Sequence, residues 1–451
     1  MSPQHFRPAA AFLCVGLVGV AGIASANPLD TFGFGSRESA MAGAMVADTH
    51  SFAANYYNPA GLVSAPGTEL AIGYFHTSQR LKINGQDNGV DPVRGVIGGI
   101  VAPGKLLGVP FAFGVAVHLP DDRLSRVHSL KDETPRWEMY DNRSQLLFIA
   151  TNLAVRPVSW LDIGGGVAYL AATTARMDIS GTAVIPPGDP YNSQLRHEVD
   201  GDLTTVRFPI AGLRVHLSDD LKIGMAYRGE SKLDLKFGAY LHGEVDYSGI
   251  RVPATYVLES QTFDVFHPRQ AVLGASYQVT PRLRTNLDLT WVDWSAYERP
   301  ISNSRTELTV EIEDLPLDIP PSPKPTVGED PRFEDRILPR LGVEFLTVAE
   351  EHVEVPVRVG YIFERSPVPE QFGNTNSVDT DRHVISAGVG LRLVNPVDLL
   401  PGDLRLDVHG AYAILPERET YKSNPADFVG DYKASGRMLT LGATLALGFD
   451  Q

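Results

Sequence analysis

Cysteine is almost absent from this sequence, and so are two other features that define large classes of protein. The 451 residues contain one cysteine, Cys14, which excludes a disulfide framework and a zinc site built from cysteines. After residue 26 no uncharged apolar run approaches the roughly 18 residues of a spanning helix, which excludes helical membrane spans. Basic residues are in deficit, with 39 Lys and Arg against 54 Asp and Glu, which excludes a phosphate-tracking nucleic-acid surface.

Signatures of catalysis are equally scarce. The chain has no Gly-x-Ser-x-Gly, no His-Glu-x-x-His, no phosphate loop and no full dinucleotide fingerprint. Gly164–Gly166 falls in a predicted strand, where small residues permit close packing. The histidines are scattered without metal-ligand spacing. We therefore predict no enzyme, no metal and no cofactor, although a barrel enzyme acting on lipids stays open because sequence does not reveal clusters formed in space.

The N-terminus predicts the compartment. Met1–Arg7 is a short basic segment, residues 8–26 carry no charge, and Ala24-Ser25-Ala26 is a small-x-small cleavage site. This pattern predicts a signal peptide over residues 1–26, cleaved after Ala26, which removes Cys14. A membrane anchor is the alternative, but the apolar core is shorter than the about 20 residues that a spanning helix needs.

Apolar residues recur with period two along most of the remaining chain. In the clearest example His383, Ile385, Ala387, Val389, Leu391 and Leu393 alternate with Val384, Ser386, Gly388, Gly390 and Arg392. Strands of about 10 residues with one apolar and one polar or small face are typical of a barrel in a membrane, with lipid outside and a polar lumen inside. A secreted β-sandwich is the competing interpretation, since its strands alternate too.

The connector lengths favour the barrel. We place fourteen strands near residues 68–82, 93–102, 110–118, 143–155, 160–180, 200–217, 221–247, 255–279, 282–313, 333–348, 352–365, 382–394, 403–414 and 437–449. Short connectors follow the even-numbered strands and long polar stretches follow the odd ones, as in outer-membrane barrels with short periplasmic turns and both ends periplasmic. The seventh strand, which starts at Leu221, is long enough to be two. Trp137, Trp291 and Trp294 are expected in the belt at the membrane interface.

Residues 27–66 do not fit the strand pattern. They are rich in Gly, Ala and small polar residues, with aromatics at Phe32, Phe34, Phe52, Tyr56 and Tyr57. A barrel of fourteen strands has a lumen too wide for its own side chains to fill, so a compact segment is well placed to plug it. We expect residues 27–66 to form this hatch and residues 67–451 to form the barrel. A disordered tail is the alternative, but such tails are poor in aromatic residues.

Several short motifs carry a resemblance. Residues 36–44 (Ser-Arg-Glu-Ser-Ala-Met-Ala-Gly-Ala) and 55–62 (Asn-Tyr-Tyr-Asn-Pro-Ala-Gly-Leu) resemble the hatch of the FadL family of outer-membrane transporters for long-chain fatty acids and other hydrophobic compounds. Further matches follow in family order at residues 268–277, 291–295, 358–361 with 366–369, and 379–388. The resemblance covers essentially the whole mature chain, and it implies a fourteen-strand barrel with an N-terminal hatch. The chain ends Phe449-Asp450-Gln451, whereas barrels of this kind usually end on an aromatic residue.

The resemblance also implies a mechanism. The expected function is passive uptake of hydrophobic molecules, most of all long-chain fatty acids, through a gated lumen pocket and a lateral exit at a kinked third strand, Val109–His118. Gly114 is the candidate for that kink, although it is equally compatible with a plain lumen-facing glycine. Phe32 and Phe34 are candidates for a gate that ligand displaces. Asn58, Pro59 and Ala60 are expected to form a structural turn that fixes the hatch.

The expected partners are a hydrophobic ligand and the lipid and lipopolysaccharide of the bacterial outer membrane. We expect no nucleic-acid partner, and we expect the protein to be a monomer. Two alternatives stay open: a barrel that displays surface loops for binding or adhesion, and uptake of aromatic hydrocarbons in place of fatty acids.

Overall fold

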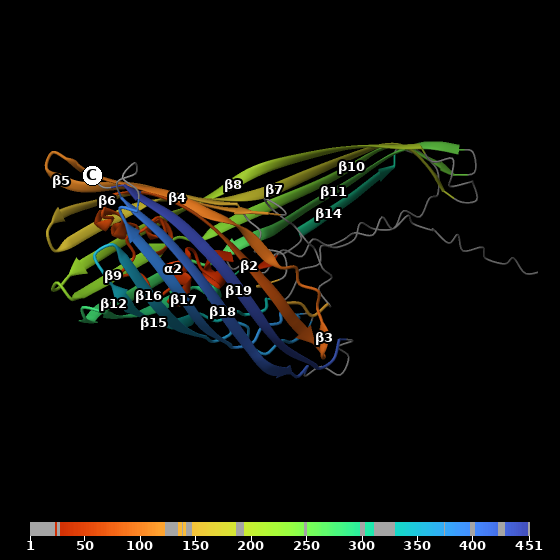
Figure 1. Ribbon diagram of the computed structural model, residues 1–451. Helices are drawn as coiled ribbons and strands as arrows, with labels where there is room; N and C mark the ends of the chain where they lie inside the picture. Colours follow the sequence, from red (N-terminus) through yellow and green to blue (C-terminus); the bar gives the residue numbers. More distant parts are fainter. Residues whose placement is uncertain are drawn as a thin grey trace, which may run out of the picture.

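The computed structural model describes residues 23–24, 28–121, 134–137, 139–140, 147–185, 194–247, 250–297, 303–310, 330–373, 375–396, 402–422 and 429–449. Figure 1 shows a closed barrel of tilted antiparallel strands, with short helices inside it and a sheet that extends beyond one end.

Fourteen strands close the barrel, as predicted. In ring order they are β2 (Thr68–Ile83), β4 (Val93–Leu106), β5 (Val109–Pro120), β6 (Phe148–Val158), β7 (Leu161–Ile185), β8 (Gln194–His216), β9 (Leu221–Arg228), β12 (Gln270–Thr280), β13 (Leu283–Val292), β15 (Arg336–Ala349), β16 (Val353–Glu364), β17 (Arg382–Val394), β18 (Asp403–Thr420) and β19 (Tyr432–Phe449). The ring closes where β19 pairs with β2, from Ala434 opposite Ile83 to Phe449 opposite Thr68. Closure gives the backbone of every strand a partner, which a bilayer requires.

The strands that do not belong to the ring lie mostly at one end of the barrel, which is the end where the sheet extends beyond the ring in Figure 1. Beyond Gly229 and Glu230, β9 is followed by β10 (Ser231–Tyr247), so the long seventh strand is divided in two. Next, β11 (Ile250–His267) leads into β12, and β14 (Asn303–Val310) follows the short helix η3 (Trp294–Ala296) after β13. Here β10 pairs with β7 and β11, and β11 pairs with β14, which gives the extension in Figure 1. The two-residue β3 (Gln86–Asp87) folds back on the end of β2 and pairs with it antiparallel.

The alternation in sequence becomes an alternation of faces. Along β17, Ile385 is 59% exposed and Val389 41%, whereas their neighbours Val384 and Ser386 are buried. The other strands of the ring show the same pattern, so large apolar side chains cover the outside. Since a water-soluble sandwich would bury these residues, the interpretation as a β-sandwich is wrong.

The two ends of the barrel differ. Five short turns lie at one end, which we call the turn end: Leu107–Gly108, Ser159–Trp160, Leu217–Asp220, Pro281–Arg282 and Glu350–His352. Thr68 and Phe449, which begin and end the ring, lie at this end as well. We call the opposite end the loop end.

The N-terminal residues fill the lumen and form the hatch. Its helices are α1 (Pro28–Phe32), α2 (Ser36–Ala40), α3 (Ala54–Tyr57) and η1 (Pro59–Ser64), and residues 34–63 are almost entirely buried. Figure 1 shows α2 inside the barrel wall. Before the hatch, the two-residue β1 (Ile23–Ala24) lies parallel to Val265–Phe266 near the end of β11. The hatch itself begins on the loop side, because Asp30 of α1 contacts Arg228 at the end of β9 and Gln270 at the start of β12, whereas the ring begins at the turn end.

Two of the three tryptophans expected at the membrane interface are elsewhere. Trp137 is fully buried and Trp294 is 1% exposed. Trp294 packs against Phe266 and Phe333 in an aromatic cluster at the loop end. The expectation was wrong for both, because an amphipathic ring serves equally well beneath a folded loop as at a lipid headgroup.

Among the described residues, no helix is long and apolar enough to cross a membrane.

Candidate ligand pocket in the barrel lumen

A pocket lies in the lumen beside the start of the hatch. Its walls are mostly apolar, with a few charged groups. The apolar lining includes Leu29, Phe32, Val272, Ile362, Val384, Ala413 and Met438, and the charged lining includes Asp30, Arg228, Asp288, Arg340 and Arg382. An apolar cavity with a few convergent polar groups is the usual form of a small-molecule site.

The carboxylate of Asp30 is held inside this pocket. Its Oδ2 accepts a hydrogen bond from Gln270 Nε2 at 2.8 Å, and its Oδ1 accepts from the Tyr56 hydroxyl and lies 3.4 Å from Arg228 Nη2. Burial and the neighbouring charge of Asp30 raise the pKa of Tyr56 well above its usual range, so this phenol stays a donor. Asp30 is therefore held by three groups, at a place where the apolar lining of the pocket meets further charged side chains, Arg340 and Arg382 among them.

Arg228 is itself held in place. Its Nη1 donates to the Tyr56 carbonyl at 3.2 Å, its Nη2 donates to Gln270 Oε1 at 2.6 Å, and its guanidinium lies over the Tyr56 ring, 4.7 Å from the centroid. The other two arginines of the pocket have partners on the wall. Arg382 pairs with Glu364 at 2.5 Å, and Arg340 donates to Thr290. The carboxylate that pairs with Arg228 belongs instead to the segment that occupies the pocket.

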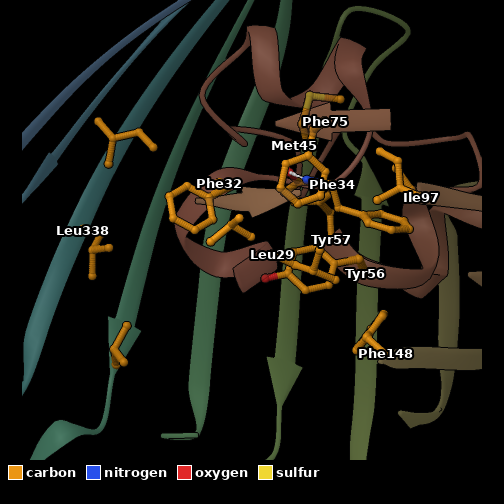
Figure 2. Close-up of a cluster of buried hydrophobic side chains, with 14 of the residues drawn as sticks. Leu29, Phe32, Phe34, Met45, Tyr56, Tyr57, Phe75, Ile97, Phe148 and Leu338 are labelled. Carbon is orange, nitrogen blue, oxygen red and sulfur yellow. Dashed lines mark hydrogen bonds between the residues drawn. The ribbon is translucent and has the colours of Figure 1, made fainter. Parts of the chain in front are cut away.

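The two candidate gate residues have different surroundings. Phe32 lines the pocket, and in Figure 2 its ring lies on the side toward Leu338. Phe34 packs in the interior of the hatch, with its ring centroid 5.2 Å from that of Phe52 and 5.8 Å from that of Tyr56. The phenylalanine that ligand would meet is thus Phe32.

The Asn-Pro-Ala motif lies between the hatch and the wall. Asn58 caps η1, with its Oδ1 accepting from the Ala60 backbone N–H at 3.0 Å. Its Nδ2 donates to the Val46 carbonyl at 2.6 Å and to the Leu213 carbonyl on β8 at 3.0 Å. Pro59, at the first position of η1, needs no hydrogen-bond partner for its nitrogen. All three residues are buried and lie apart from the pocket lining.

Gly114 lies in an unbroken part of β5. It pairs with Val101 on β4 and with Asn152 on β6, and neither ladder shifts register there. A Cβ at this position would overlap the Asn55 side chain and Leu62 of the hatch. In this structure Gly114 is a lumen-facing glycine that admits the hatch, and both ladders of β5 run through it without a shift of register.

The hatch is tied to the wall by a network of charged groups that sequence reasoning did not find. Asp48 pairs with Arg37 at 2.6 Å and with Arg284 at 3.2 Å, and Arg37 pairs with Glu344 at 3.3 Å. Arg358 then joins Glu344 to Asp407 at 2.6 and 2.5 Å. Burial alone would raise the pKa of Asp48, but the charges of Arg37 and Arg284 hold it below its usual range.

A second set of charged groups lies under η1. Arg214 and Arg156 converge on Asp162, at 2.8 and 2.5 Å, and both donate to the hydroxyl of Ser64 at the end of the hatch. His216 lies 2.9 Å from the same carboxylate. In the part of the chain that the structure describes, no group of three His, Cys, Asp or Glu residues could hold a metal ion.

Comparison with known proteins identifies the family. Residues 17–446 match the family model described as "Outer membrane protein transport protein (OMPP1/FadL/TodX)". The chain belongs to this family. It is 22% identical over 393 residues to alkane uptake protein A of Marinobacter nauticus, which covers 81% of this chain and 79% of that protein.

Solved structures of other proteins have the same fold as this member of the OMPP1/FadL/TodX family. A Pseudomonas aeruginosa FadL homologue has a TM-score of 0.55 at 15% identity, covering 92% of this chain and 98% of that one. The Pseudomonas putida toluene transporter TodX has a TM-score of 0.54 at 15% identity, covering 95% and 100%. Because the family lies in the outer membrane, where short turns are periplasmic, the turn end is the periplasmic end.

Glycines in the wall of this family member make room for the hatch. A Cβ on Gly212 would overlap Asn58, and one on Gly164 would overlap the backbone of Pro59 and Ala60. We therefore expect Gly212→Ala to displace the hatch and to destabilise it by about 1–3 kcal/mol, the usual cost of overpacking. Gly165→Ala is the matched control, since a Cβ at this position would lie 3.3 Å from its nearest neighbour, the carbonyl oxygen of Ile210.

Thermal unfolding and proteolysis of the hatch measure the difference between these two variants. Equal behaviour of Gly212→Ala and Gly165→Ala would show that the hatch does not depend on this close contact.

Proposed function

We propose that this chain is a passive outer-membrane transporter for hydrophobic molecules that carry a carboxylate, with long-chain fatty acids as the main substrate. The bound carboxylate of Asp30 is the observation that carries this proposal. A pocket that holds a carboxylate with Arg228, Gln270 and Tyr56 amid apolar walls has the groups that a fatty acid needs.

In this proposal the ligand and the start of the hatch compete for one site. The carboxylate of the fatty acid takes the place of Asp30, and its alkyl chain takes the space of Leu29 and Phe32. Cleavage after Ala26 would leave only Asn27, Pro28 and Leu29 ahead of Asp30, so little chain has to move. The gate needs a ligand that binds the open form more tightly than the closed one, and competition for Arg228 provides that difference.

The exit remains part of the proposal. Since β5 is fully paired at Gly114, a lateral exit requires the ladder between β5 and a neighbour to open after ligand enters. The contact of Gly114 with Asn55 and Leu62 is the place where a movement of the hatch would reach β5. We keep the division into signal peptide (1–26), hatch (27–66) and barrel (67–451), and a monomer in contact with lipopolysaccharide, as parts of the same proposal.

Hydrocarbons without a carboxylate are the second candidate substrate. A relative is named an alkane uptake protein, and structural neighbours are named as toluene and monoaromatic hydrocarbon channels. The apolar lining of the pocket would suit such molecules as well. The two candidates differ in one respect, because only an acid has to displace Asp30 from Arg228.

Transport can be tested in liposomes whose outer leaflet contains lipopolysaccharide, with an enclosed fluorescent fatty-acid-binding protein as reporter. We expect hexadecanoate to enter faster than in protein-free vesicles. Net entry should stop when its free concentrations inside and outside are equal, without any energised partner. Removal of residues 27–34 should change the rate. The uptake of hexadecane is measured separately, from its partition into the vesicles. If the protein accelerates the uptake of hexadecane but not that of hexadecanoate, the second candidate is favoured. If neither enters faster through a folded barrel, a surface-binding role becomes the better account.

A further inference from the structure

The periplasmic rim is apolar on one side. Six exposed apolar residues, which we call the apolar rim, lie at or next to three successive turns: Leu106 (64% exposed), Leu107 (97%), Val109 (40%), Val158 (43%), Trp160 (53%) and Leu217 (60%). The turns are neighbours around the barrel, because β5 pairs with β6 and β7 pairs with β8.

We propose that the apolar rim lies in the inner leaflet of the outer membrane and binds its phospholipid. The rim is continuous with the lipid-facing wall. Directly above it the outward residues Phe113, Leu153 and Leu213 are 39–59% exposed, so the apolar surface runs down the strands and onto the turns without a polar break. A surface that faces acyl chains above extends most simply to the acyl and headgroup boundary below.

The conformation of Leu107 supports a role outside the protein. Leu107 and Gly108, with φ of 52° and 83°, form a two-residue turn between β4 and β5. Asn84 and Gly85, with φ of 50° and 78°, form a turn of the same kind after β2. Asparagine is the favoured residue at that first position, whereas leucine is strained there. A strained and almost fully exposed leucine gains nothing from packing within the chain.

The opposite side of the rim has a different character. Its turns include Pro281–Arg282 and the exposed residues Glu350, Glu351 and His352. On the apolar side the exposed Lys105 precedes Leu106, and an ammonium group beside apolar residues suits a phospholipid phosphate. The acidic Asp219 and Asp220, after Leu217, mark where the apolar rim ends.

The depth of a spin label in the membrane tests this proposal. In a Cys14→Ser background of the full-length gene, nitroxide is attached at Leu107→Cys, at Glu350→Cys as the matched turn of the other side, and at Leu273→Cys as an outward-facing strand position that is 50% exposed. The folded protein is reconstituted into phosphatidylethanolamine and phosphatidylglycerol vesicles. Collision rates with oxygen and with a water-soluble nickel chelate then measure the depth of each label.

We expect the label at residue 107 to have at least fivefold less contact with nickel than the label at 350, and to lie at a depth between the labels at 350 and 273. Equal nickel contact at 107 and 350 would overturn the proposal. Protection at 107 in native membranes but not in pure lipid would also overturn it, and would indicate a protein partner.

A second measurement does not require a change at the turn. Brominated phospholipid should quench the fluorescence of Trp160, taken as the difference between the natural chain and Trp160→Phe. Absence of quenching would contradict the proposal, and this result does not depend on whether the Leu107→Cys variant folds.

Discussion

Arg228→Gln is expected to weaken the binding of hexadecanoate about 30-fold relative to the binding of hexadecane. The guanidinium is buried and makes an ion pair with the carboxylate of Asp30. Truncation of one partner of a buried hydrogen-bonded charge pair costs about 2–5 kcal/mol, and the lower figure corresponds to about 30-fold. Only an acid would lose this interaction, so the ratio of the two affinities reports the carboxylate.

The complementary variant should act in the opposite direction. Asp30→Asn removes the internal competitor but keeps the size of the side chain, so hexadecanoate should bind several-fold more tightly. Arg340→Gln is the matched control, because Arg340 lines the same pocket but donates to Thr290 of the wall. Equilibrium binding in detergent measures all three variants, with heat-modifiable migration as the check on folding. An equal loss of affinity in Arg228→Gln and Arg340→Gln would mean that Asp30 does not mark the carboxylate site.

Asp48→Ala is expected to release the hatch. Asp48 is 2% exposed and pairs with Arg37 and Arg284, so its removal leaves a buried guanidinium without one of its counter-charges. Breaking a buried pair in this way costs about 3–5 kcal/mol. Because the hatch fills the lumen, its release should raise the ion conductance of single channels in a planar bilayer.

The control for Asp48→Ala is an ion pair at the turn end of the wall. Asp403→Ala breaks the pair with Arg392 at 2.5 Å, which lies within the wall and does not involve the hatch. Its conductance should stay that of the natural chain. If Asp48→Ala also conducts like the natural chain, the hatch is held by packing alone and the charged network is dispensable.

The pH dependence of hatch retention follows from the same carboxylate. The pKa of Asp48 is lowered in the folded protein, so its contribution to stability is fully present above the usual pKa of aspartate and is lost as pH falls through the lowered value. The contribution of Asp48 to the retention of the hatch should therefore be constant from pH 8 to about pH 4. Loss of this contribution in stronger acid should raise the conductance.

The barrel was predictable because its physics is local. The alternation of residues 383–393 predicts β17 to within a residue at either end, since each side chain faces either lipid or lumen. Glycines also carried local information: Gly164 was expected to permit close packing, and it admits Pro59 and Ala60. The resemblance to the family was likewise local, since it was carried by short motifs of the hatch and by further motifs that follow in family order along the barrel.

The contacts that determine the site were not predictable. Arg37 meets Glu344, and Asp30 meets Arg228 and Gln270, across separations that no spacing rule covers. The expected exposure of Trp137 and Trp294 was wrong for a related reason, because Trp137 packs against Tyr140 and Trp294 against Phe266 and Phe333, contacts that periodicity does not predict. Periodicity identifies which face of a strand is inward, but a partner inside the lumen depends on how the hatch sits.

A structure of the mature chain with hexadecanoate bound tests the central claim most directly. The account predicts the ligand carboxylate within hydrogen-bond distance of Arg228 and Gln270, with Asp30 displaced and the alkyl chain in the space that Leu29 and Phe32 now occupy. Hexadecanoate bound elsewhere in the barrel, with Asp30 still paired to Arg228, would contradict it.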